Sequence, residues 1–209
     1  MEENTMRLDK VILRAALNTL AAIGILIAFM IFALCFIFPS TMMRITYDLG
    51  MDGSSIRNAK RAYRYSGSVD YIAYATEVAI GADDDEYISE CGKMFIADDE
   101  FTVYCQKRNA ALPEGVEGVY EQYVYGQVSV AEYRLGNKDS AVDIAFDGVQ
   151  NSFPKNNAVV ALLLTAFKGN DRTTVLKIYM EMDAIDETIS TEEKAYFNEI
   201  FALCQQSNG

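Results

Sequence analysis

The feature that most constrains this chain is an uncharged, mostly apolar run near its N-terminus, which covers residues 15–38. A helix needs about 20 apolar residues to cross a hydrocarbon core about 30 Å thick. This run is therefore long enough to span a membrane with some tilt. A signal peptide has a shorter apolar region of about 7–15 residues. We therefore predict a single-pass transmembrane helix that stays attached to the chain.

The charges flanking this run predict its orientation. Three bases precede it: Arg7, Lys10 and Arg14. On the other side, Arg44 is the only base before Arg57. Because basic residues favour the cytoplasmic side, we expect a cytoplasmic N-terminus and an extracytoplasmic C-terminal domain. A basic group between residues 57 and 64 lies at the edge of the range of this rule, and counting it would weaken or reverse the bias.

The composition excludes several kinds of function. The chain has no histidine, so Ser-His-Asp and Cys-His catalysis are impossible. Residues 39–209 hold 27 acidic and 15 basic residues, which argues against a nucleic-acid partner and against broad contact with an anionic membrane surface. We expect no enzyme activity, no cofactor, no metal and no small-molecule substrate.

The pattern of apolar residues after the run predicts an all-α domain. We divide the chain into a polar tail (1–14), the transmembrane helix (15–38), a juxtamembrane helix and linker (39–53) and a helical-repeat domain (54–206). Acidic runs at 83–86 and 98–100 predict helix starts, where carboxylates favour the helix dipole. Calcium binding is the alternative, but the EF-hand spacing is absent. Ser190 and Glu193 have the spacing of a capping box.

A basic face is expected on the predicted helix 54–66. Its members are spaced i, i+3, i+4 and i+7: Arg57, Lys60, Arg61 and Arg64. Residues at these spacings lie side by side on a helix. The face is either solvated and paired with the many acids of this chain, or it contacts lipid head groups or an anionic partner.

Two cysteines are candidates for a disulfide. Cys91 and Cys105 are equally far from position 98, the predicted turn between two helices. In an antiparallel hairpin they would lie at the same height. An extracytoplasmic domain would favour a disulfide between them, whereas the alternative is two small buried side chains. Structural zinc is not expected, because no CxxC pair and no histidine is present.

Two Gly-Asn pairs, Gly136-Asn137 and Gly169-Asn170, suggest helix-turn-helix units that repeat along the chain. Their separation is close to the period of about 34 residues that is typical of tetratricopeptide repeats. The residues that match the repeat are Tyr125, Val128, Ser129, Tyr133, Leu135, Gly136, Asn137, Ala141, Ala145 and Pro154. In this pattern the chain resembles the tetratricopeptide-repeat family. The resemblance is clearest over 116–183, where Thr174 stands in place of an expected alanine. In 54–110, Gly67 and Gly81 do not keep the period.

The resemblance implies a right-handed α-solenoid that binds a peptide or protein. The candidate contacts are four tyrosines: Tyr120, Tyr123, Tyr125 and Tyr133. Tyrosine gives a large contact area with a polar tip, although inter-helix packing is the alternative for each. The acidity of the domain favours a basic partner.

A second function fits the same sequence, namely a non-catalytic structural subunit of a larger membrane complex. Small residues in the predicted span would permit close helix approach: Ala21, Ala22, Gly24 and Ala28.

Overall fold

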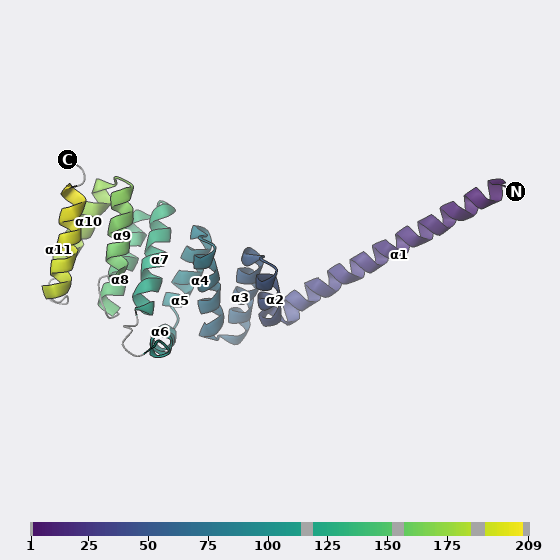
Figure 1. Ribbon diagram of the computed structural model, residues 1–209. Coiled ribbons are helices and arrows are strands. Elements are labelled where there is room, and N and C mark those ends of the chain that lie inside the picture. Colours follow the sequence, from purple (N-terminus) through teal and green to yellow (C-terminus); the bar gives the residue numbers. More distant parts are fainter. Residues whose placement is uncertain (1, 114–118, 152–156, 185–190, 207–209) are drawn as a thin grey trace.

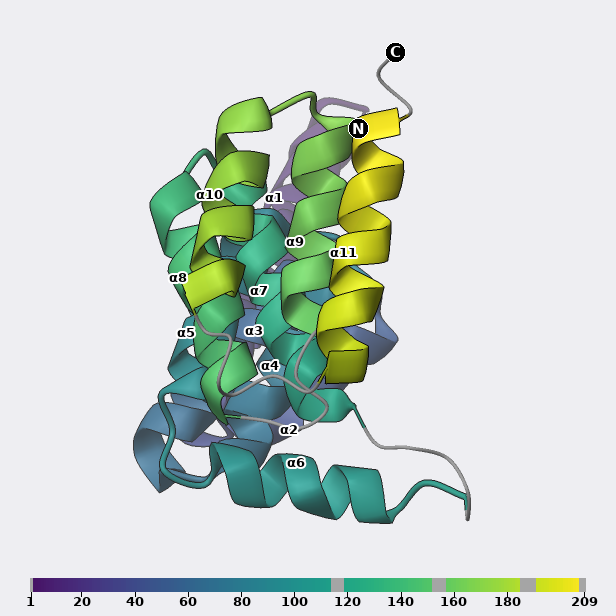
Figure 2. The same ribbon diagram turned by 90° about the vertical axis from the view of Figure 1, so that its left-hand side faces the viewer.

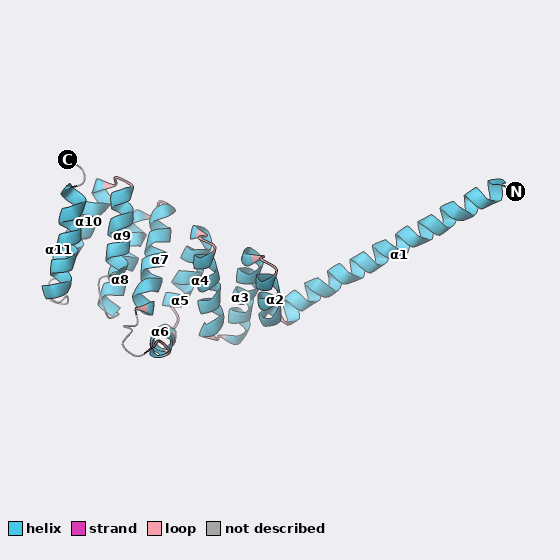
Figure 3. Cartoon of the chain, in the orientation of Figure 1, coloured by secondary structure: helices cyan, strands magenta, loops and turns pink. Residues whose placement is uncertain are grey.

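The computed structural model describes residues 2–113, 119–151, 157–184 and 191–206, and every element within these ranges is an α-helix (Figures 1 and 3). In chain order the helices are α1 (Glu2–Ile37), α2 (Pro39–Asp48), α3 (Asp52–Ser66), α4 (Val69–Gly81), α5 (Asp85–Ile96), α6 (Phe101–Ala110), α7 (Tyr120–Arg134), α8 (Lys138–Asn151), α9 (Asn157–Lys168), α10 (Arg172–Ala184) and α11 (Thr191–Gln206). The prediction of an all-helical chain is confirmed. Pro154 and the capping box starting at Ser190 lie outside the described residues.

Helix α1 is a single rod of 36 residues that projects away from the other helices (Figure 1). Its segment Ile12–Leu34 is long and apolar enough to cross a membrane, judged by length and composition. The polar tail predicted before this segment is helical from Glu2, because Glu, Leu, Lys and Arg all favour helix.

Pro39 separates α1 from α2. The proline ring disfavours helical geometry at the preceding residue, and Phe38 has φ −129° and ψ 59°. Pro39 itself occupies the first turn of α2, where its missing N–H costs nothing. The first helix therefore ends one residue before the predicted limit, and the chain turns back at once into α2 and α3.

Four helices end in the same hydrogen-bonded turn. Each turn contains one residue with positive φ, and the next N–H donates to the carbonyl five residues before it, which is the Schellman arrangement. The positive-φ residues are Gly50, Asp83, Gly136 and Asn170. The closing bonds are Met51 to Thr46 (2.8 Å), Asp84 to Ala79 (3.2 Å), Asn137 to Glu132 (2.9 Å) and Asp171 to Ala166 (2.9 Å).

These turns recur at a nearly constant interval on either side of one longer gap. The interval from Gly50 to Asp83 almost equals that from Gly136 to Asn170, whereas the interval between Asp83 and Gly136 is longer. Burial recurs with the turns. The positions eight residues before each turn are all buried, namely Met42, Ala75, Val128 and Leu162. So are those seven residues before it, namely Met43, Thr76, Ser129 and Leu163. The helix pairs α2–α3, α4–α5, α7–α8 and α9–α10 are therefore built on one pattern of turn and core.

Helix α6 interrupts this pattern and accounts for the longer middle interval. It runs crosswise to the other helices and lies near the ends of α4 and α7 (Figure 2). Phe101 and Cys105 are its buried residues, and Phe101 packs edge-to-face on Phe95 at 4.8 Å. The predicted antiparallel hairpin of the helices that hold Cys91 and Cys105 is therefore wrong.

Across this interruption α5 packs directly on α7. Gly92 makes the approach possible, because a Cβ at this position would lie 2.2 Å from Cγ2 of Val128. One core cluster extends from Met43 to Ala158 through this contact. A second cluster joins α8, α9 and α10 around Leu162, Leu163 and Ile178.

Candidate functional site

The four candidate tyrosines of α7 do not form one surface. Tyr125 is 5% exposed and packs edge-to-face on Phe101 at 5.7 Å. A Cβ on Gly148 would lie 2.9 Å from Tyr125, so this residue fills the α7–α8 interface. Its assignment as a partner contact is wrong: it is a core residue.

Tyr133 lies near the opposite end of α7 from Tyr120. Its hydroxyl donates to Asp171 Oδ2 at 3.3 Å, and Lys138 Nζ lies 5.9 Å from its ring centroid. Burial, followed by the charge of Asp171, raises the pKa of Tyr133. This tyrosine therefore fastens α7 to the start of α10.

Tyr120 and Tyr123 lie together at the edge of the core, where Tyr120 is partly buried and Tyr123 is 43% exposed. Their ring centroids are 6.4 Å apart. The Tyr120 hydroxyl donates to Glu77 Oε1 at 2.6 Å, and Arg108 Nη2 lies 3.1 Å from the same oxygen. Burial and the bond to Glu77 raise the pKa of Tyr120, so its hydroxyl stays a neutral donor. Glu77 therefore connects α4, α6 and α7.

A cleft of about 410 Å³ adjoins this group on the side of α2. We call it the tyrosine cleft; its side chains with polar atoms are Tyr47, Asp52, Tyr74 and Glu77. The two tyrosine rings meet edge-to-face at 6.0 Å. Among the described residues that line this cleft, none is basic. The Asp52 carboxylate beside two aromatic rings provides the ion-pair and cation–π partners that a Lys or Arg side chain prefers, whereas Glu77 Oε1 is already engaged by Tyr120 and Arg108.

The residues of the tyrosine cleft were not among the predicted contacts. Tyr74 and Glu77 are three residues apart, so they share a face of α4. That polar pair was the available sequence signal. Tyr47 and Asp52 flank the turn at Gly50, and only the packing of α2 on α3 and of α3 on α4 brings them to the same place as Tyr74 and Glu77.

The basic residues of α3 contact two different parts of the molecule. Arg57 donates to the Tyr87 hydroxyl at 3.1 Å, and Lys60 pairs with Glu90, so both fasten α3 to α5. Arg61 instead lies over the ring of Phe36 in α1, with 4.9 Å from the guanidinium carbon to the ring centroid. Arg64 is exposed one turn further along.

Cys91 and Cys105 are free and buried. No disulfide joins them in this structure, because the crosswise α6 replaces the hairpin that would have paired them (Figure 2). Burial raises the pKa of each thiol to about 12. In this structure the two cysteines are therefore small buried side chains, which was the alternative to a disulfide.

A buried carboxylate joins α5 to α7. Glu132 is 1% exposed; it accepts from Ser89 and pairs with Lys93 Nζ at 2.7 Å. Burial opposes its ionisation, but hydrogen bonds from Lys93, Ser89 and Ser140 prevail and lower the pKa of Glu132. Because these side chains of α5 and α8 satisfy the carboxylate with hydrogen bonds and an ion pair, we assign Glu132 a structural role. Within the described ranges, no group of three or more His, Cys, Asp or Glu residues is placed to hold a metal ion.

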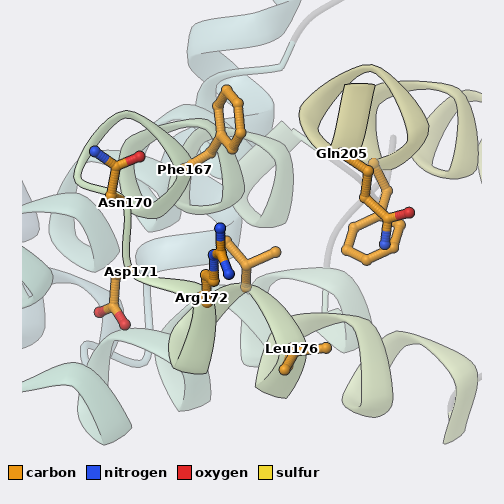
Figure 4. Close-up of a pocket in the computed structure, with 8 residues that line it drawn as sticks. Phe167, Asn170, Asp171, Arg172, Leu176 and Gln205 are labelled. Carbon is orange, nitrogen blue, oxygen red and sulfur yellow. The ribbon is translucent and has the colours of Figure 1, made fainter. Parts of the chain in front are cut away.

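A second cleft, of about 320 Å³, lies between α9, α10 and α11. We call it the terminal cleft. Figure 4 shows Arg172 rising from the first turn of α10 into the space between Phe167 and Gln205. Leu176 on α10 is 55% exposed, although the equivalent positions six residues after the three earlier turns are all buried: Ile56, Ser89 and Val142.

Comparison of the chain with protein-family models, with curated proteins and with solved structures finds no match.

Proposed function

We propose that this chain is a membrane-anchored interaction module that binds a peptide or protein partner on a helical-repeat surface. The anchor is α1, whose segment Ile12–Leu34 has the length and composition of a span. In this proposal the N-terminus is cytoplasmic and the helical domain is extracytoplasmic. The module has no catalytic step and acts by holding its binding surface near the bilayer.

We further propose that the four helix pairs form a right-handed α-solenoid of tetratricopeptide-like units, with α6 inserted after the second pair. The support is the recurrence of one turn at nearly equal intervals on either side of α6. A helix pair cannot bury its apolar face alone, so neighbouring pairs stack. The first two units are then part of the same array as the clearer repeats in 116–183.

The observation that carries the binding proposal is the tyrosine cleft. Asp52 and Glu77 lie beside the rings of Tyr47 and Tyr74 in a cleft of about 410 Å³, and Tyr47 is half exposed. Aromatic rings supply contact area at a low cost in side-chain entropy. Asp52 selects for positive charge, and Glu77, which is already paired with Arg108, adds to the negative charge beside the cleft. The ligand in this proposal is therefore a peptide segment that presents Arg or Lys.

The test is selection of displayed nonapeptides on the full chain held in lipid nanodiscs. We expect the bound peptides to share Arg or Lys and to lose binding to the double variant Asp52→Asn, Glu77→Gln. The amides keep the shape of the carboxylates and remove their charge. Glu86→Gln, Asp99→Asn is the matched control, because both residues are exposed acids outside the cleft. Enrichment of acidic peptides, or equal binding to both double variants, would overturn the proposal.

A structural subunit of a larger membrane complex is the second candidate, and the terminal cleft favours it. In the three earlier helix pairs the next helix covers the positions that correspond to Leu176 and Tyr179. Here α11 contacts α9, and its Phe201 stacks on Tyr179 at 4.5 Å, but Leu176 stays 55% exposed. A repeat array usually ends in a polar cap, so another subunit is the natural cover for this apolar end. Leu176→Asp would then release that subunit, whereas Asp52→Asn would not.

A further inference from the structure

Charge is divided unequally along the helical domain. Residues 39–66, which form α2 and α3, hold five basic and two acidic residues, a net charge of +3. Residues 67–209 hold ten basic and 25 acidic residues, a net charge of −15. Figure 1 places α2 and α3 next to α1, with α7–α11 at the far end. The net positive part of this acidic domain is thus the part that adjoins the candidate span.

One of these cations, Arg61, contacts the end of that span. Arg61 lies 4.9 Å from the ring centroid of Phe36, which is two residues beyond Leu34 and thus about 3 Å further along the helix axis. Arg64 follows on the same face of α3 and is exposed. Arg57 and Lys60 are already engaged with α5. The pair Arg61 and Arg64 therefore lies at the height of the lipid head groups.

A cleft of about 340 Å³, which we call the span-end cleft, is lined by the chain neighbours of these two cations, Ala62 and Tyr65. Phe36 and Ile37 of α1 line it together with Tyr65 and Tyr71. Ser40 and Ser66 add hydroxyl groups. Apolar residues at the end of the span, polar hydroxyls and nearby guanidinium groups together match the parts of a phospholipid: acyl chain, glycerol and phosphate.

We infer that the span-end cleft binds the head group of an anionic phospholipid, with Arg61 and Arg64 on the phosphate. The inference rests on the proposal that α1 is a membrane anchor. The lipid fixes the orientation of α2 and α3 on the bilayer surface, while the acidic remainder of the domain is repelled by the same surface and extends away from it. The acidity of the domain as a whole therefore does not exclude local contact with anionic lipid.

The test uses the full chain in nanodiscs of phosphatidylcholine with about one fifth phosphatidylglycerol, released for native mass spectrometry. We expect phosphatidylglycerol to be enriched several-fold over its bulk fraction among the lipids that stay bound. The variant Arg61→Gln, Arg64→Gln returns the ratio to the bulk value, since each cation near an anionic surface raises the affinity for that surface about fivefold. Lys107→Gln, Lys168→Gln removes two exposed charges elsewhere and leaves the enrichment intact.

Two further measurements keep the outcome interpretable. Circular dichroism checks that the double variant is folded, and Arg64→Gln alone, at an exposed position, gives an intermediate ratio. A bulk ratio in the wild type, or equal losses in both double variants, would overturn the inference. Alkaline extraction of membranes tests the anchor separately: if the chain resists extraction but shows no lipid enrichment, the lipid site fails and the anchor stands.

Discussion

The contact between α5 and α7 makes a quantitative prediction through Gly92. An added methyl group at this position would lie 2.2 Å from Cγ2 of Val128, far inside the separation of about 3.5–4.0 Å at which carbon atoms attract. Overpacking of this kind costs about 1–3 kcal/mol. Replacing a helical glycine by alanine returns about 1 kcal/mol of helix propensity. We therefore expect Gly92→Ala to lower the free energy of unfolding by about 1 kcal/mol.

Gly81 provides the matched control, because the space around its Cβ position is empty within 4 Å and its φ is not positive. Gly81→Ala should be neutral or stabilising by up to about 1 kcal/mol. Val128→Ala should cost about 2 kcal/mol on its own through lost burial and a cavity. In the double variant Gly92→Ala, Val128→Ala the new methyl group fills part of that cavity. The two changes should then couple favourably by about 1 kcal/mol or more.

The assay is urea unfolding of the full chain in detergent, followed by the near-ultraviolet circular dichroism of tyrosine. Every tyrosine lies beyond residue 46, so the signal reports the helical domain and not α1. If Gly92→Ala were as stable as Gly81→Ala, or if the coupling with Val128→Ala were absent, α5 and α7 would not meet at this point. The pairing of units across α6 would then be refuted.

Three further predictions concern charge, thiols and topology. The pKa of Glu132 is lowered in the folded state, so its charged form stabilises the fold at neutral pH, and this stabilisation is lost as the pH falls through that pKa. The pKa of Glu121 is raised in the folded state, so its charged form destabilises the fold at neutral pH. Urea unfolding at pH 7 should therefore show Glu132→Gln as destabilised and Glu121→Gln as stabilised, with both differences shrinking at low pH; the reverse order at pH 7 would contradict the assignment. Cys91 and Cys105 are buried thiols, so reductant should leave the melting temperature unchanged and both should react with maleimide only after unfolding; a melting temperature that falls with reductant would indicate a disulfide. An impermeant maleimide should label Cys204 in intact cells, whereas labelling only after lysis would place the domain in the cytoplasm.

Several elements of the fold were predictable because they depend on local chemistry. The candidate span follows from the length of one apolar run. Acidic residues begin α5 as expected, and Asp84 is its N-cap, accepting from the Tyr87 N–H at 3.1 Å. The turns after α7 and α9 were marked by Gly-Asn pairs, and both have the predicted position.

The matching turns of the first two helix pairs were not predicted, because glycine was the wrong marker for them. Gly67 has a positive φ but ends α3, the second helix of its pair. In the α4–α5 pair the left-handed residue is Asp83 and not Gly81. Aspartate tolerates this conformation because its short side chain bonds locally. The insertion of α6 then displaced the remaining turns from the period.

The candidate site was the least predictable part, because it depends on which faces of different helices meet. Tyr125 and Tyr123 are two residues apart, yet one fills a helix interface and the other is exposed. The four cations of α3 share a helix face, but α5 engages two of them and the end of α1 a third. Helical spacing alone contains no information about these neighbours.

Photo-cross-linking from the tyrosine cleft in native membranes tests most directly whether this cleft binds a partner. A photoreactive phenylalanine at Tyr47 should form an adduct with a partner protein, and the same residue at the exposed Leu135 should not. The adduct should disappear when Asp52→Asn and Glu77→Gln are added, because the cleft then lacks its charge. An adduct that persists without these carboxylates, or one that forms only at Leu135, would contradict the assignment of this cleft as the binding surface.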